Sequence, residues 1–105
     1  MTIPVNVTEQ DSTLIVSQKQ HQLTLLLTTS STAPNNLVCH FQADHKDLNA
    51  EVAAPTNKPL FLAKRIVSFL GAYVRIQDPD FLEGEVLRWI ERHTRSANSK
   101  PNNNV

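Results

Sequence analysis

Apolar and polar residues alternate with a period of two through the first half of the chain. Side chains on one face of a strand recur at every second position, so this alternation predicts strands with one buried face. Leu23, Leu25 and Leu27 show the pattern most clearly. About five strands are expected within residues 2–54, around residues 3–7, 13–17, 22–29, 37–43 and 48–52.

Short polar segments separate the predicted strands. Turns are expected at residues 9–12, 18–21 and 44–47, and a loop that contains Pro34 is expected at residues 30–36. Parallel strands need long crossover connections, whereas these connections are short. Successive short strands with close turns therefore favour an antiparallel meander.

After Pro55 the apolar spacing becomes that of a helix. Beyond a break at residues 55–59, apolar residues recur in two adjacent rows, namely Leu60, Ala63, Val67, Leu70 and Val74, and Leu62, Ile66, Phe69 and Tyr73. This spacing favours one continuous helix over residues 60–76 with a broad apolar surface. In the alternative interpretation, Gly71 ends the helix and residues 72–77 form a sixth strand.

A second helix is predicted to begin at residues 78–80. Asp78 can act as the N-cap, and Pro79 is tolerated at the first helical position because its missing N–H has no intrahelical role there. Alternatively, Asp80 and Glu83 form a capping box two residues later. The expected buried row is Leu82, Val86, Trp89, Ile90 and His93, and the helix is expected to end near Arg95.

These elements predict an α+β fold. An antiparallel meander of about five strands in residues 2–54 is followed by two C-terminal helices that pack on one face of the sheet. The length of 105 residues suits one domain. We expect a single domain over residues 1–95 and a disordered polar tail over residues 96–105.

The composition argues against several classes of protein. Ten basic and ten acidic side chains cancel, so long-range attraction to nucleic acid or an anionic membrane is not expected. Cys39 is the single cysteine, which excludes an internal disulfide. Two glycines form no phosphate-binding loop, and no cofactor is expected. Charged residues interrupt the most apolar stretch, and no signal-peptide pattern is present, so we expect a cytoplasmic protein with no membrane partner.

Basic residues on the predicted helices could form an anion-binding or nucleic-acid surface. The candidates are Lys64, Arg65, Arg75, Arg88, Arg92 and Arg95. The last three are spaced so that they share one helical face. However, acidic residues crowd the start of the same helix, an arrangement that complements the helix macrodipole. A structural role for the arginines is therefore favoured.

The segment CHFQADH, residues 39–45, holds the residue types that ligate metals or act as nucleophiles. A metal site would use Cys39, His45 and His21, but strand alternation directs Cys39 into the core. No C-x₂-C or H-x₃-H pair is present. A thiol buried among apolar groups has a raised pKa and is not activated. We therefore expect no catalytic residues, no metal site and no enzymatic activity.

The remaining interpretation is a small cytoplasmic non-enzymatic interaction or regulatory module. It would bind another protein, form a homodimer, or both, because the apolar surface of residues 60–76 exceeds what one sheet can cover. Candidate interface residues are Leu62, Phe69, Tyr73 and Trp89. The alternative function is nucleic-acid binding through the basic helical faces.

Overall fold

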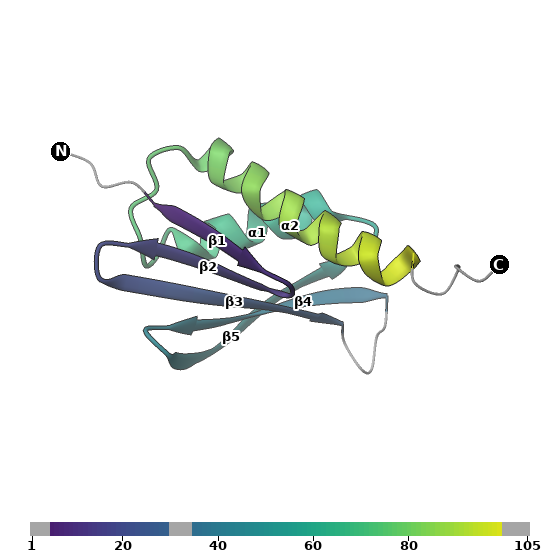
Figure 1. Cartoon of the computed structure of the whole chain (residues 1–105), viewed down its shortest axis with the longest axis horizontal. Helices are drawn as coiled ribbons and strands as arrows, with labels where there is room; N and C mark the ends of the chain where they lie inside the picture. The colour runs from purple at the N-terminus through teal and green to yellow at the C-terminus, as the bar shows by residue number, and fades with distance from the viewer. Residues whose placement is uncertain (1–4, 30–34, 100–105) are drawn as a thin grey trace.

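The computed structural model of the chain describes residues 5–29 and 35–99, with side chains described up to residue 94. These residues form the strands β1 (Asn6–Gln10), β2 (Thr13–Gln18), β3 (His21–Thr29), β4 (Asn36–Ala43) and β5 (Lys46–Pro55), followed by the helices α1 (Pro59–Leu70) and α2 (Pro79–Ser99). The strands make one sheet in the order β1-β2-β3-β4-β5, and every neighbouring pair is antiparallel. The predicted α+β meander with two C-terminal helices is thus confirmed (Figure 1).

One hydrophobic core lies between the sheet and the two helices. The sheet contributes the alternating residues that the pattern predicts, including Leu23, Leu25 and Leu27 from β3, each at most 2% exposed. The largest buried side chains are Trp89 of α2 and Phe41 of β4. The other face of the sheet is more polar and more exposed, as at His40. This arrangement explains the period-two pattern, because only one face of the sheet is covered by helices.

The sheet turns use local chemistry that suits tight hairpins. Asp44 and His45 link β4 to β5 with φ values of 50° and 70°, which is the backbone of a turn whose twist matches that of the strands. The side chain of Asp44 accepts a hydrogen bond of 2.9 Å from the N–H of Gln22. This hydrogen bond, followed by the interactions with His21, holds the pKa of Asp44 below its usual value.

Helix α1 is shorter than the apolar spacing predicts. It ends at Leu70, and residues 72–77 form neither helix nor strand, so both the continuous helix over residues 60–76 and the sixth strand are wrong. The N–H groups of Ala72 and Tyr73 donate to the carbonyls three residues back, as in a tightened last turn. Gly71 has φ of −63°, so the helix does not end in a left-handed glycine.

The segment after α1 is held by a side chain of the sheet. Gln18 of β2 accepts a hydrogen bond of 3.1 Å from the N–H of Arg75 and donates one of 2.8 Å to its carbonyl. Both backbone groups of Arg75 are thereby engaged outside a helix. Val74 beside it is 5% exposed and joins the core. A contact across 57 residues of sequence therefore stabilises the irregular path that the helical pattern did not predict.

Helix α2 begins where the sequence predicts. Pro79 is its first residue, and the Oδ1 atom of Asp78 accepts a hydrogen bond of 3.0 Å from the N–H of Phe81. Asp78 is therefore the N-cap, and the alternative capping box at Asp80 and Glu83 is not used. The helix continues through Ser99, beyond the expected end near Arg95.

Candidate functional site

Three of the six basic residues proposed as an anion surface form ion pairs with carboxylates. Lys64 of α1 lies 3.0 Å from Glu83 of α2. Arg88 pairs with Glu85 one turn earlier. Arg92 makes a bidentate contact with the carboxylate of Glu9 in β1, and this contact raises the pKa of the guanidinium. Lys64 and Arg92 connect different elements of the fold, whereas Arg88 pairs within α2. The charge of each cation is balanced locally.

Two of the other three basic residues, Arg65 and Arg75, lie in different local settings. The guanidinium carbon of Arg65 lies 4.9 Å from the ring centroid of Phe61, in a cation–π contact. Arg75 is exposed, and its backbone is held by Gln18. The side chain of Arg95 lies outside the described side chains.

Two of the four proposed interface residues lie in the core. Leu62 and Trp89 are both 0% exposed, so in this structure a partner cannot contact them. The indole N–H of Trp89 donates a hydrogen bond of 3.2 Å to the carbonyl of Asp11, which anchors the β1–β2 turn to α2. Phe69 is partly buried and stacks on Phe41 with 4.1 Å between the ring centroids. Tyr73, 45% exposed, is the one that remains largely at the surface.

Cys39 and the histidines near it are separated by the fold. The side chain of Cys39 is 0% exposed, as predicted, and burial raises the pKa of its thiol. His21 lies beside Asp44, and His40 points to the other face of the sheet, beside Glu51. Within the described part of the chain, no group of three His, Cys, Asp or Glu side chains is placed to hold a metal ion.

An open apolar groove lies between the first turn of α1 and the middle of α2. We call it the helix groove. It has a volume of about 440 Å³, and its apolar lining comes from Pro59, Leu60, Phe61 and Leu87. Leu60 and Phe61 are 46% and 47% exposed. Lys58, Lys64 and Glu91 supply the charged groups of the lining.

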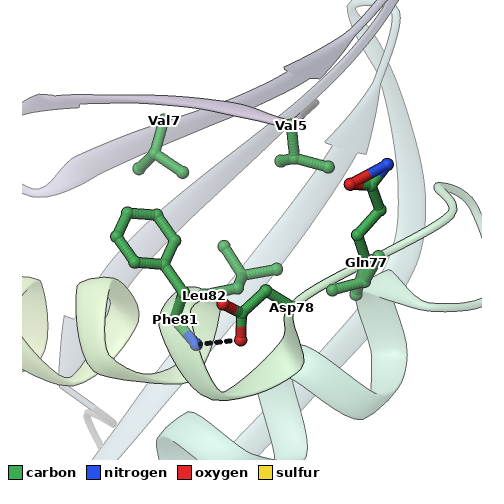
Figure 2. Close-up of a pocket in the computed structure, with 7 residues that line it drawn as sticks. Val5, Val7, Gln77, Asp78, Phe81 and Leu82 are labelled. Carbon is green, nitrogen blue, oxygen red and sulfur yellow. Dashed lines mark hydrogen bonds between the residues drawn. The ribbon is translucent and has the colours of Figure 1, made fainter. Parts of the chain in front are cut away.

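A second pocket opens beside β1, and we call it the edge pocket. It has a volume of about 190 Å³. Figure 2 shows Val5 and Val7 on the strand side and Phe81 and Leu82 of α2 on the helix side, with the Phe81 ring next to Val7. Phe81 is 58% exposed, the largest value among the big apolar side chains found exposed in the described residues. The pocket is therefore an apolar crevice whose main helical residue remains in solvent.

The sequence interpretation missed the residues that make both surfaces. Phe61 and Phe81 each precede a buried residue, Leu62 and Leu82, by one position. One position is 100° around a helix, so an aromatic residue just outside the buried row faces the flank of the helix. The offset of one position between each phenylalanine and the buried row was therefore the sequence signal that could have predicted an exposed aromatic side chain.

Comparisons of the chain with protein-family models, with curated proteins and with solved structures find no match. None of the helices in the described residues is long and apolar enough to cross a membrane.

Proposed function

We propose that the protein is a non-enzymatic interaction module of the cytoplasm, and that the helix groove binds a segment of another protein. The observation that carries this proposal is the exposure of Leu60 and Phe61, neighbouring large apolar residues that line one groove. A contiguous exposed apolar surface is typical of a binding site. Aromatic residues are also enriched where proteins meet.

The groove offers both an apolar anchor site and charged groups around it. A partner residue with a large apolar side chain would lie against Leu60, Phe61 and Leu87. Lys58 and Glu91 are available to polar groups that flank the anchor. In such a site a few apolar contacts supply most of the binding energy, and the polar contacts fix the orientation of the bound segment.

Nucleic-acid binding is the second candidate, and the ion pairs weigh against it. A phosphate-binding face needs cations that are free to replace counterions along the backbone. Lys64, Arg88 and Arg92 each lie against a carboxylate instead. We therefore retain the protein-binding proposal.

The test compares three immobilised forms of the chain in an extract of the source cells. The forms are the natural chain, Phe61→Asp in the groove, and Ser68→Asp as a matched control at an exposed position of α1 outside the groove. A bound polypeptide is identified, purified and titrated against each form. We expect Phe61→Asp to weaken binding by more than about tenfold and the control to bind normally. Equal binding by all three forms would refute the role of the groove.

A further inference from the structure

The two edge strands of the sheet differ in how well they can accept another strand. β5 carries features that oppose pairing at its outer edge. It contains the charged residues Lys46, Asp47 and Glu51 and ends at Pro55. Its register with β4 shifts between His40 and Gln42, and Asn49 has φ of 53°. Charges, proline and irregular backbone are the usual means by which edge strands avoid association.

β1 lacks the proline and the irregular backbone, and it carries a single charged residue. All five residues of Asn6–Gln10 pair with β2 in an unbroken register. The strand contains neither lysine nor proline. Its single charge, on Glu9, is already paired with Arg92 of α2. β1 is therefore an exposed edge without protection against a further strand.

The hydrogen-bond pattern shows which backbone groups of β1 point outward. The N–H of Leu27 in β3 donates to the carbonyl of Ser12. Successive residues of a strand direct their backbone groups to opposite sides, so Thr13, Ile15 and Ser17 bond to β1 instead. Their partners are Gln10, Thr8 and Asn6. The N–H and carbonyl groups of Val7 and Glu9 consequently face the outer edge.

We propose that β1 pairs in antiparallel fashion with β1 of a second copy of this chain, which joins two sheets about a twofold axis. One register makes the fullest use of the outward backbone groups of Val7 and Glu9. In this register Val7 lies opposite Val7 of the second copy, and Glu9 lies opposite Val5 of the second copy. No two like charges are opposed in this register. This dimer surface is distinct from the helix groove, so it does not depend on the proposed function.

The side chains of β1 also suit a second copy on both faces. On the helix face, Val7 and Phe81 of each copy would meet across the axis and fill the edge pocket (Figure 2). On the other face, Asn6 would lie opposite Thr8, a polar pair that suits a solvated surface. The extended sheet keeps the apolar layer under the helices and the polar layer outside.

The size of this surface predicts a weak dimer. A stable interface buries roughly 800 Å² on each partner. A strand of five residues and one large side chain, Phe81, supply only part of such an area. We expect a monomer–dimer equilibrium that depends on concentration between the micromolar and millimolar ranges.

Sedimentation velocity over that range tests the proposal with three variants. Val7→Pro removes an outward N–H, and edge strands tolerate proline where the N–H faces solvent. Phe81→Ser removes an exposed apolar group. Ala53→Pro is the matched control on β5. The N–H of Thr56 donates to the carbonyl of Asn35, so Thr56 directs its backbone toward the β4 side. Backbone groups alternate sides along a strand, and those of Ala53, three positions earlier, therefore point outward like those of Val7. Circular dichroism checks that each variant is folded.

We expect the natural chain and Ala53→Pro to form the dimer and Val7→Pro to lose it. Phe81→Ser should associate at least tenfold more weakly, a loss on the order of one buried aromatic contact. A natural chain that stays monomeric throughout would refute the proposal. A dimer of normal strength in Phe81→Ser and in folded Val7→Pro would also refute it. Should Val7→Pro fail to fold, the Phe81→Ser result decides.

A crosslink tests the register directly. In the proposed dimer the two Val7 Cα atoms are about 5.5 Å apart, as in a hydrogen-bonded antiparallel pair, and this distance suits a disulfide. Val7→Cys should therefore oxidise to a covalent dimer, whereas Gln10→Cys, far from the axis, should not. The native Cys39 is buried and does not compete. Equal crosslinking of both variants, or of neither, would contradict this register.

Discussion

The two helices pack on the same sheet, but their boundaries have different origins. The start of α2 is local, because Pro79 follows an N-cap side chain, Asp78, that bonds to the first turn. Lys58 at the start of α1 makes no such side-chain bond. The segment after α1 is held from the sheet by Gln18. A helix end that is encoded locally can be predicted, whereas one held by a distant residue cannot.

The helices also distribute their apolar residues differently. In α2 the residues Leu82, Val86, Trp89 and Ile90 are at most 2% exposed and form one buried row. In α1 the apolar residues occupy more of the circumference than the core can cover. Leu60 and Phe61 therefore remain at the surface, where they line the helix groove. The excess apolar surface of a helix thus indicates where a partner can bind.

Removing the largest core side chain of α2 should have the largest effect on stability. Trp89→Ala should lower the free energy of unfolding by about 3–5 kcal/mol, because it leaves a cavity and removes the anchor of the β1–β2 turn. Tyr73→Ala, at an exposed aromatic residue just after α1, should cost far less. Urea titrations of both variants measure the difference. Equal losses would mean that the residues after α1 are as fixed as the core of α2.

The local start of α2 is tested at its N-cap. Asp78→Ala removes the acceptor for the N–H of Phe81 and should lower the free energy of unfolding by about 0.5–2 kcal/mol. Lys58→Ala should be nearly neutral, because Lys58 makes no side-chain cap bond. Thermal unfolding of the pair measures this contrast. If the Lys58 variant lost as much stability, the distinction between the two helix starts would be wrong.

A substitution at Gln18 tests whether its hydrogen bonds fix the segment after α1. Gln18→Ala removes two hydrogen bonds to the backbone of Arg75, and we expect a loss of about 1 kcal/mol because both are exposed. The amide of Arg75 should exchange with deuterium faster, while amides in the middle of α2 keep their protection. Gln20→Ala, in the exposed β2–β3 turn, is the control. Unchanged exchange at Arg75 would show that the core contact of Val74 alone fixes this segment.

The smallest effects are expected at the exposed ion pairs of α2. Arg88→Ala and Arg92→Ala should each lower the free energy of unfolding only slightly, since exposed pairs contribute little. Oligonucleotide binding should be weak in the natural chain and in both variants. Fluorescence titrations at several salt concentrations measure this binding. Tight binding whose salt slope falls by about one for each arginine removed would instead support a nucleic-acid surface.

The candidate surfaces were only partly predictable. The broad apolar surface of residues 60–76 indicated a partner-binding element, but the interface residues proposed from it included Leu62, which lies in the core together with the proposed Trp89. Helical spacing shows that residues share a face, and it does not show which of two adjacent rows the sheet will cover. The exposed row became known only when both helices were placed.

The sequence by itself determined the strand order of the meander, the buried row of Leu23, Leu25 and Leu27, and the N-cap of α2. These features depend on the alternation of neighbouring residues and on side chains that bond within one turn. Tertiary structure decided the path after Leu70 and the composition of the two pockets. Phe61 and Leu87 line the same groove, and Val7 and Phe81 line the same pocket, only because the packing of α1, α2 and β1 brings together residues that are distant along the chain. No local sequence pattern contains that information, because it depends on which faces of the helices and the sheet are already buried in the core.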